Sequence, residues 1–384
     1  MRMIYTNQVD LTERTGQGTH EKEISRLLLN DLTIEGIYVG QKPPEKHEYD
    51  DRENVFLLSL NKTFFGYFWY QVRLFLILAK LSGAKDTVIF QRYAPAMIAP
   101  ALVSFFYKVP MVTRTGPVIR NLGVYDKPTN LLFKATLNLF VKFNYHVSRY
   151  LVVVTETIKH YVLKNYNLKK NKIIISGNGF NPAIFKLDSD YSSTPENIFV
   201  FFCGSFHKDT GVDDLLEAIF ILAKKMGGER RCVLAGDGPL KTQLQERYKS
   251  SQCNWEVIFP GRVSQQNINQ FLNQSRVGVV PFNTMGLSET GSAAVKIFEY
   301  LASGTPVVAT RHSDHEFIEI NELGSLCNPD DPFDMAACLE SYGDVMTTYN
   351  KDRFVQFALD NGTWEKSYKS LRKICRMALY GNPK

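Results

Sequence analysis

Apolar residues in the second half of the chain form short, nearly continuous runs that alternate with amphipathic segments. We predict strands at residues 199–205, 231–238, 257–261, 277–282 and 306–310, and helices at 212–225, 240–250, 265–273 and 292–303. Continuous apolar strands that alternate with helices are typical of a parallel sheet covered on both faces. The pattern therefore predicts a doubly wound, Rossmann-like α/β domain.

The first half repeats this alternation less regularly. We predict a first helix within residues 15–29, a helix capped by Thr155, and strands at 3–6, 87–91, 110–115, 150–155 and from 172. The stretch 187–197 is rich in Ser, Asp and Pro, which suits an interdomain linker. We therefore expect two Rossmann-like domains that face a shared cleft with the carboxyl ends of their strands.

Charge is distributed unevenly along the chain. Residues 1–190 hold 25 Lys and Arg against 16 Asp and Glu, whereas residues 191–384 hold 20 against 23. A basic first half fits peripheral contact with an anionic membrane surface, and a soluble domain that is simply basic explains it equally well. There is no Lys/Arg block of the kind that marks a nucleic-acid tail, so we expect no nucleic-acid partner.

The remaining composition favours a cytoplasmic protein. The six cysteines form no CxxC pair, which argues against a zinc site and for a reducing compartment. The longest apolar stretch, 74–79, is too short to span a membrane, and the N-terminus does not have the pattern of a signal peptide. We expect a location in the cytoplasm, with the inner membrane face as the site of any peripheral contact.

The helix expected at 292–303 begins with small residues and carries a Lys and a Glu on one face. Its backbone N–H groups and its dipole favour an anion such as phosphate. Lys296 lies about one turn from the start, and Glu299 follows three residues later on the same face. An offset of roughly 8–10 Å along the axis suits a carboxylate that binds ribose hydroxyls. The alternative is an ion pair on an exposed face.

The wider pattern resembles the family 4 glycosyltransferases of GT-B fold, in their K-x-x-E-Y subtype. The resemblance is carried by K-x-x-E-Y-x-A-x-G-x-P-V-V-A at 296–309. Further matching segments are GSFHKDTGVDDLLEA (204–218), LAGDGP (234–239), FPGRV (259–263), SGNGFNPAIF (176–185) and TWEKSYKSLRKI (363–374). The resemblance implies an acceptor domain at 1–186, a donor domain at 187–363 and a C-terminal helix at 364–384 that returns to the first domain.

The resemblance implies a retaining glycosyltransferase of class EC 2.4, which moves a sugar from a nucleoside diphosphate donor to a glycan or lipid-linked acceptor. Glu299 matches the acid that holds the ribose, and Lys296 with the amides of Ala294 and Val295 matches the diphosphate-binding helix start. The other residues that the resemblance assigns to donor binding are Gly16, Gln17, Gly18, Gly204, Ser205, Lys208, Arg262, Val263, Gly291 and Ser292. We expect neither a metal ion nor another cofactor.

Several positions depart from the family pattern. Gly291 stands where most members have a first acid that touches the sugar, and Glu289, two residues too early, is a candidate to replace it through a shift of the loop. Ser205 and Thr210 replace the usual Arg and Lys in the loop after the donor domain's first strand, where His207 and Lys208 are candidates to supply the charge.

The first half offers further candidates, each with an alternative. His20 is a candidate to contact the reacting sugar, or a capping or satisfied surface residue. Arg114 is a candidate for a phosphate or acceptor contact, or a solvated strand-end residue, and Arg120 flanks the same position. Arg92 with Tyr93 is a candidate acceptor contact, or a packed Tyr beside a partly exposed Arg. The D-x-D triplet at 188–190 has no strand before it, and we interpret it as a solvated turn.

Three functional hypotheses follow. The first is a retaining glycosyltransferase in polysaccharide or glycoconjugate biosynthesis that acts by stabilising the departing diphosphate, with Lys296, Glu299 and His20 as the reaction-site candidates. The second is a sugar-nucleotide epimerase, which the motif set disfavours. The third is a catalytically silent nucleotide-sugar binder or partner subunit, which the missing acid and the missing Arg/Lys pair keep open. The sugar, the base, the acceptor and the oligomeric state stay undetermined by the sequence.

Overall fold

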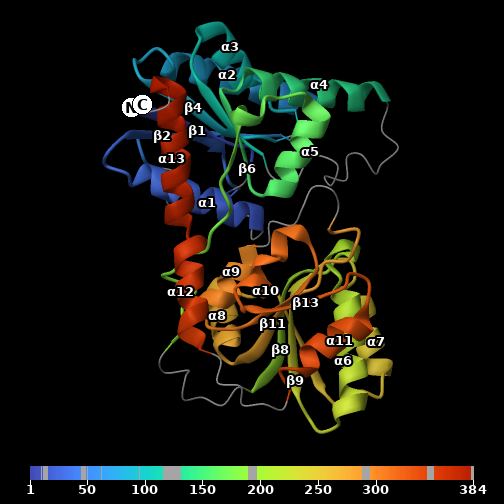
Figure 1. Cartoon of the computed structure of the whole chain (residues 1–384). Helices are drawn as coiled ribbons and strands as arrows, with labels where there is room; N and C mark the ends of the chain where they lie inside the picture. Colours follow the sequence, from blue (N-terminus) through green and yellow to red (C-terminus); the bar gives the residue numbers. More distant parts are fainter. Residues whose placement is uncertain are drawn as a thin grey trace. The chain divides into compact units, whose positions relative to one another are not determined.

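The computed structural model describes residues 1–9, 11, 16–44, 49, 51–61, 63–94, 96–115, 131–188, 197–287, 295–343 and 350–381, without the side chains of 16, 17 and 131–134. The chain divides into two compact units. The first contains Met1–Asn178 and Trp364–Lys384, and the second contains Gly179–Thr363. Figure 1 shows the course of the chain through both.

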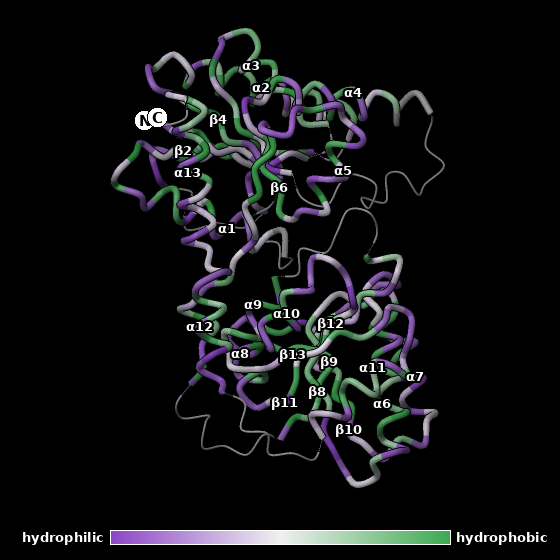
Figure 2. Tube along the Cα trace, viewed as in Figure 1, coloured by the Kyte–Doolittle hydropathy of each residue, from purple (hydrophilic) through white to green (hydrophobic). Residues whose placement is uncertain are grey.

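The first unit is built on a seven-stranded parallel sheet in the order β3-β2-β1-β4-β5-β6-β7. Strand β1 pairs with β2 on one side and β4 on the other, which gives the order reversal of a doubly wound sheet. The strands are β1 (Arg2–Thr6), β2 (Glu35–Gln41), β3 (Val55–Leu58), β4 (Thr87–Arg92), β5 (Met111–Arg114), β6 (Tyr150–Val153) and β7 (Ile173–Ile175). Figure 2 shows hydrophobic residues along β4 and β6.

Helices cover this sheet. They are α1 (Gly16–Leu29), α2 (Phe64–Leu81), α3 (Ala99–Tyr107), α4 (Leu131–Val147), α5 (Glu156–Tyr166) and α13 (Trp364–Tyr380), with a 3₁₀ turn at Lys170–Lys172. Apolar residues of α2 and α3 pack on the sheet in one core cluster with partly buried residues of α4, while α13 packs on α1, β4 and β5. Thr155 caps α5 as predicted, because its side chain accepts a hydrogen bond from the amide of Ile158.

The second unit has a six-stranded parallel sheet in the order β10-β9-β8-β11-β12-β13. Its strands are β8 (Ile198–Ser205), β9 (Arg231–Asp237), β10 (Glu256–Gly261), β11 (Ser275–Val280), β12 (Val307–Thr310) and β13 (Gly324–Cys327). Its α-helices are α6 (Val212–Met226), α7 (Lys241–Ser250), α8 (Gln265–Asn273), α9 (Val295–Ala302), α10 (Phe317–Ile320), α11 (Pro332–Glu340) and α12 (Lys351–Asn361), and two 3₁₀ turns lie at Lys208–Thr210 and Ser313–His315.

Two apolar cores, one on each face of this sheet, explain its continuous hydrophobic strands. Buried residues of α6 and α11 pack with Val200, Phe202 and Leu234 on one face. Buried residues of α8, α9 and α12 pack with Phe201 and Val233 on the other. Neighbouring residues of one strand thus enter opposite cores, as expected for a sheet buried on both sides. The predicted fold class, α/β with two parallel doubly wound sheets, is confirmed.

The division into compact units lies a few residues before the boundary expected at residue 186. Backbone hydrogen bonding joins Phe180 to Gly362, and a β-bridge joins it to Thr363. The amide of Lys186 donates to Asn269 Oδ1 at 3.0 Å. These contacts hold residues 180–186 in the second unit. Most of the predicted linker, together with Ser189 and Asp190 of the D-x-D triplet, lies outside the described residues.

Within the described parts of the chain, no helix combines the length and the apolar character needed to cross a bilayer. The apolar stretch 74–79 lies inside α2, where Leu74 and Leu78 are buried in the core of the first unit.

Gly211, at the start of α6, illustrates how tightly the loops after β8 and β11 pack. Its φ of +63° is a left-handed conformation, and a Cβ built there would lie 1.7 Å from the carbonyl oxygen of Pro281. Gly228 has a similar φ of +67°, but its Cβ would meet no atom within 4 Å. The two glycines therefore share a positive φ and differ in the space around them.

We expect Gly211→Ala to destabilise the protein far more than Gly228→Ala. The left-handed backbone costs a non-glycine residue about 1–2 kcal/mol at either site. At Gly211 the collision with Pro281 adds to that cost, and we expect at least about 2 kcal/mol more. Urea unfolding of both variants measures the difference. Equal losses of unfolding free energy would contradict this account of the loop.

Candidate functional site

Helix α9 carries the Lys and Glu singled out in the sequence. Its buried side consists of Ile297, Tyr300, Leu301 and Ala302. The Tyr300 hydroxyl accepts a hydrogen bond from the amide of Cys203 in β8 at 3.0 Å. Because α9 follows the parallel strand β11, its start lies at the edge of the sheet where the strands end.

Lys296 extends from α9 to the carboxyl end of β8. A Cβ built on Gly204 would lie 2.8 Å from Lys296 Nζ, so the absence of a side chain at Gly204 makes room for the ammonium group. The same Nζ lies 5.7 Å from the centroid of the Phe202 ring. The structure thus brings together two of the residues assigned to donor binding, Gly204 and Lys296, which are far apart in the sequence.

Glu299 lies beside this cation and is half-buried. Burial raises the pKa of Glu299 to about 7, although the charge of Lys296 acts in the opposite direction. Both charges also act on the Cys203 thiol, whose pKa burial raises to about 11. Lys296 is half-buried too, so the alternative of a solvated pair on an exposed face does not fit.

The loop after β8 presents polar side chains at the same edge. Ser205, His207 and Lys208 are exposed. The carbonyl of Lys208 accepts a hydrogen bond from the side-chain amide of Asn283, which fixes this loop to the one after β11. The hydroxyl of Thr210 donates to the carbonyl of His207 at 2.7 Å. His207 and Lys208 are therefore available to solvent on an anchored loop, whereas Thr210 is buried and structural.

Arg262 and Val263 follow β10 at this edge. Val263 is partly buried against the core of the second unit. Arg262 has a side chain that is 63% exposed, and its Nε lies 3.9 Å from Asp237 Oδ2. Lys241 Nζ lies 3.7 Å from the other oxygen of the same carboxylate. Ion pairs as exposed as these contribute little to stability, so both cations remain free to interact with a ligand.

Other predicted positions lie outside the described residues. These are Gly291, Ser292 and Ala294 of the helix start, and Glu289, Gly116 and Arg120. Val295 is the first residue of α9 and is half-buried.

A cavity of about 700 Å³ opens at the opposite edge of the second sheet. Its lining includes Phe199, Arg231 and Glu256, which lie where β8, β9 and β10 begin, and also Trp255 and Arg276. In open α/β sheets ligands bind at the carboxyl ends of the strands. We therefore assign the functional site to the edge with Lys296 and Glu299 rather than to this cavity.

In the first unit, α1 begins with the predicted glycine-rich segment. Gly16 is the first residue of the helix, Gln17 is the second, and Gly18 is buried. His20 is 2% exposed, and its ring makes an edge-to-face contact with Trp364 at 5.2 Å. The alternative of a surface histidine is therefore wrong. Burial, together with the charges of Arg114 and Arg92, lowers the pKa of His20 to about 3, so the ring is neutral at pH 7.

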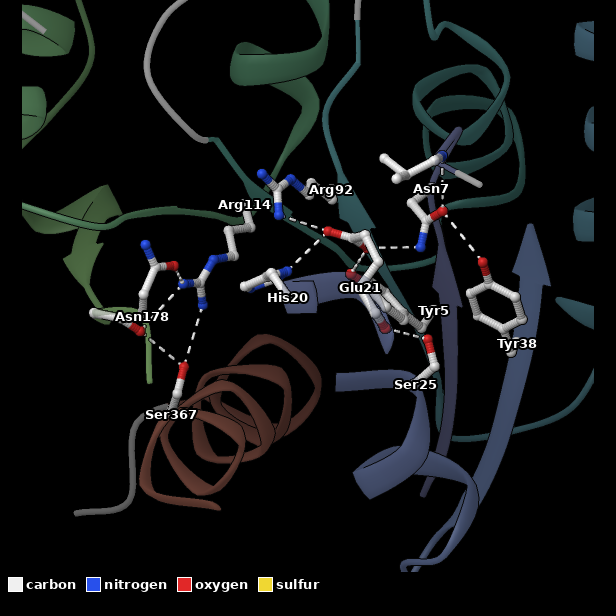
Figure 3. Close-up of polar contacts among 12 residues, drawn as sticks. Tyr5, Asn7, His20, Glu21, Ser25, Tyr38, Arg92, Arg114, Asn178 and Ser367 are labelled. Atoms are coloured by element: carbon white, nitrogen blue, oxygen red, sulfur yellow. Dashed lines mark hydrogen bonds and ion pairs between the residues drawn. The ribbon is translucent and has the colours of Figure 1, made fainter. Parts of the chain in front are cut away.

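Glu21 is the centre of a buried polar cluster at this edge of the first sheet (Figure 3). Its carboxylate accepts hydrogen bonds from Tyr5 and from Asn7 Nδ2, the latter at 2.6 Å. Arg92 Nη1 lies 2.6 Å and His20 Nδ1 2.8 Å from Glu21 Oε1. Burial alone would raise the pKa of Glu21, but Arg92 and the hydrogen bonds bring it down to about 2. Because Glu21 stays ionised, the His20 proton lies on Nδ1 and Nε2 is left as an acceptor.

Arg114, at the end of β5, is 1% exposed, which excludes the alternative of a solvated residue. Its guanidinium donates to Gly177 O at 3.1 Å, Asn178 Oδ1 at 2.9 Å and Ser367 Oγ at 3.4 Å (Figure 3). All three acceptors are uncharged. Burial and the charge of Arg92 lower the pKa of Arg114 to about 10, which leaves it cationic at neutral pH.

The neighbouring candidates also have internal partners. Arg92 has a side chain only 14% exposed and is held by Glu21. Tyr93 is 7% exposed, and its ring lies 6.0 Å from that of Tyr145. Sequence reasoning did not identify Glu21 and Asn7. The available signals were that Asn7 directly follows β1 and that Glu21 is an acid in a helix which begins with glycines.

The described residues contain no group of three or more His, Cys, Asp or Glu side chains arranged to hold an ion.

Part of the chain is similar in sequence to known glycosyltransferases. Residues 197–342 match the sequence profile described as "Glycosyl transferases group 1". The amylovoran biosynthesis glycosyltransferase AmsK of Erwinia amylovora is 30% identical over 130 residues, which cover 34% of this chain and 32% of that protein. The match thus spans about a third of the relative's own length.

Solved structures extend the similarity to nearly the whole chain. A glycosyltransferase from Rickettsia africae aligns over 99% of both chains with a TM-score of 0.74 at 16% identity. Residues 197–342 therefore match the group 1 glycosyltransferase profile, and nearly the whole chain has the fold of this solved glycosyltransferase. The Anabaena protein HepE, solved in complex with UDP, aligns over 98% of this chain and 100% of its own with a TM-score of 0.73 at 13% identity.

The two parallel α/β sheets of the chain agree with the GT-B fold of glycosyltransferases. The predicted fold is confirmed, and the profile match confirms the predicted family for residues 197–342. The K-x-x-E-Y subtype and the role of each site residue stay predictions.

We expect Glu21→Gln to destabilise the protein by about 3–5 kcal/mol at pH 7, because the variant leaves Arg92 buried without its counter-charge. The pKa of Glu21 is lowered from 4.5 to about 2 on folding. The contribution of ionised Glu21 to the free energy of unfolding is therefore complete above pH 4.5 and is lost as the pH falls toward 2. Urea unfolding at pH 7, 4.5 and 3 measures the difference in unfolding free energy between wild type and variant. We expect this difference to become smaller as the pH falls.

Glu35→Gln is the matched control in the same unit. Glu35 pairs with Arg2 at 2.6 Å but is 57% exposed, so we expect little change at any of these pH values. A Glu21→Gln protein as stable as the control would show that the cluster does not support the fold.

Proposed function

We propose that this protein is a group 1 glycosyltransferase that moves a sugar from a nucleoside diphosphate donor to a hydroxyl group of a glycan or lipid-linked acceptor, with retention of anomeric configuration. The observation that carries the proposal is the position of Lys296 Nζ against Gly204 with the half-buried Glu299 beside it, where parallel strands end. In this proposal the second unit binds the donor and the first unit binds the acceptor.

Each donor group has a chemical match in the second unit. The diphosphate lies at the start of α9, where Lys296 and the amide of Val295 stabilise its charge. The ribose hydroxyls donate to Glu299, and the nucleobase lies against Arg262 and Val263. Lys208, exposed on the anchored loop after β8, supplies further positive charge. The UDP in the structure of Anabaena HepE makes uridine diphosphate the first nucleotide to test.

The transfer relies on stabilising the leaving group. Negative charge develops on the departing diphosphate, and a fixed ammonium group and helix amides stabilise it without reorganisation. The acceptor hydroxyl enters on the face that the diphosphate leaves, and the orientation of the two substrates supplies the remaining rate enhancement. His20, which is neutral and whose Nε2 has no hydrogen-bond partner among the described residues, is the proposed contact to the reacting sugar. The scheme needs neither a metal ion nor another cofactor.

We also propose that the basic first half contacts an anionic membrane surface from the cytoplasmic side, where a lipid-linked acceptor would be available. The excess of 25 Lys and Arg over 16 Asp and Glu in residues 1–190 supports this contact.

The second candidate is a nucleotide-sugar binder without transfer activity. It is favoured by Gly291 at the position of the usual acid, and by Ser205 and Thr210 in place of the usual Arg and Lys. Thr210 is buried and bonded to its own loop, so it does not replace a cation.

We expect UDP-sugars to bind the wild-type protein and to bind Lys296→Ala at least about tenfold more weakly, because a charge-assisted contact contributes about 1.5–3 kcal/mol. Lys225→Ala is the control, since Lys225 is 62% exposed and pairs with Glu340 at 2.6 Å. Titration calorimetry with UDP-glucose, UDP-galactose and UDP-N-acetylglucosamine measures the affinities, with GDP- and ADP-sugars as the comparison.

The pH dependence of binding isolates Glu299. Its pKa is about 7 in the folded protein, and ribose hydroxyls donate better to the ionised form. We therefore expect affinity for UDP-glucose to rise between pH 6 and pH 8 in the wild type and to stay flat in Glu299→Gln. A parallel rise in both proteins would contradict the ribose assignment.

Donor hydrolysis and transfer to a broad acceptor panel separate the two candidate functions. A wild-type protein that binds a nucleotide sugar but neither hydrolyses nor transfers it favours the silent binder. Failure to bind any nucleotide sugar excludes both.

A further inference from the structure

Helix α2 of the first unit has an apolar outer face as well as an apolar inner one. Tyr70, Leu74 and Leu78 are buried in the core. On the other side, bulky apolar side chains are largely exposed, and these are Phe64 (79%), Phe65 (73%), Phe68 (55%), Trp69 (56%) and Leu76 (61%). Single exposed apolar residues are ordinary, but a row of them along one helix indicates a contact surface.

The end of helix α3 extends this surface. Phe105, Phe106 and Tyr107 are 48%, 64% and 52% exposed. The ring of Tyr107 lies 6.2 Å from Phe75 of α2, and that of Phe105 lies 6.1 Å from Phe143 of α4. Figure 1 shows α2, α3 and α4 next to one another on one side of the first unit. We call the exposed side chains Phe64, Phe65, Phe68, Trp69, Leu76, Phe105, Phe106 and Tyr107 the aromatic face.

The helices that carry the aromatic face contain no acidic residue. Neither α2 nor α3, nor the adjoining α4, has an Asp or Glu. Arg73 and Lys80 are exposed on the outer side of α2. Directly after α3, Lys108 holds its Nζ 5.0 Å from the centroid of the Phe105 ring. Cations therefore border the apolar surface.

The positive charge of the first half is concentrated in the stretch of sequence that contains α2, α3 and α4. Residues 64–155 hold eleven Lys and Arg and two Asp and Glu, an excess of +9, which equals the whole excess of residues 1–190. Residues 1–63 are net acidic, with eight Lys and Arg against eleven Asp and Glu. Among these cations Arg92 and Arg114 are held by internal partners, whereas Arg73, Lys80 and Lys108 are exposed on or next to the helices of the aromatic face.

We propose that the aromatic face docks on an anionic lipid bilayer. Trp, Tyr and Phe side chains are suited to the boundary between headgroups and acyl chains, and Lys and Arg beside them interact with anionic headgroups. The inner side of α2 is committed to the core, so the helix lies along the membrane surface. A second copy of the chain fits less well, because two acid-free basic surfaces would repel each other.

This inference refines the membrane contact included in the proposed function, but it is tested without donor or acceptor. The tryptophans make the test specific. Trp69 is 56% exposed, whereas Trp255 and Trp364 are each 1% exposed. We expect the emission of Trp69 to shift to shorter wavelength with phosphatidylcholine vesicles that contain roughly 30% phosphatidylglycerol, and brominated lipids to quench it. Trp69→Phe should still bind but lose the spectral change.

Vesicle co-sedimentation of further variants separates the apolar and ionic contributions. We expect Phe65→Ser/Trp69→Ser to bind at least about tenfold more weakly, since two large apolar side chains lose their burial. Phe333→Ser, at a residue that is 70% exposed in the second unit, is the matched control and should bind as the wild type does. Arg73→Gln/Lys80→Gln should weaken binding about fivefold per charge at low salt and much less at high salt.

Three results would overturn the proposal. The first is a wild-type protein that neither sediments with these vesicles nor changes its Trp emission. The second is an equal loss of binding in Phe333→Ser. The third is a lipid-free dimer in light scattering that Phe65→Ser/Trp69→Ser abolishes without any vesicle binding by the wild type, which would assign the surface to a second copy. Unfolding midpoints close to that of the wild type confirm that the variants are folded.

Discussion

Helix α9 is anchored to the second sheet by Tyr300, and the candidate donor site depends on that anchor. The ring of Tyr300 packs on Gly278 of β11, where a Cβ would lie 2.4 Å from it. Its hydroxyl accepts the amide hydrogen of Cys203 in β8. With this side chain fixed on two adjacent strands, Lys296, one turn earlier, reaches Gly204, and Glu299 lies half-buried beside it. Packing therefore determines the chemistry available at this edge.

The first unit uses its charges differently. Glu21, Arg92 and Arg114 are stabilised by internal partners, and burial keeps His20 neutral. Such a cluster is rigid because each charge has a fixed neighbour, and removing one member leaves another unpaired. The outer surface of the same unit differs from this cluster, because its aromatic side chains and cations are exposed to solvent. The first unit therefore combines an apolar core, a buried cluster of paired charges and an exposed aromatic face.

Sequence alone predicted much of the second unit, because strands buried on both faces are continuously apolar. Strands β2, β3 and β13 were not predicted. β3 and β13 are short edge strands of four residues, and β2 begins and ends with polar residues. The Lys296–Glu299 pair was found because both residues lie on one helix. The Glu21 cluster was not, because its members at 5, 7, 21 and 92 meet only after the sheet has formed.

Hydrogen exchange with and without a saturating UDP-sugar tests the donor assignment most directly. The account predicts protection of backbone amides in the loop after β8, at residues 204–211, and in the first turn of α9, at residues 295–299. Amides that border the cavity at the other edge, at 229–231 and 253–256, should exchange unchanged. Protection confined to the cavity, with none at β8 and α9, would contradict the assignment of the site to the carboxyl ends of the strands.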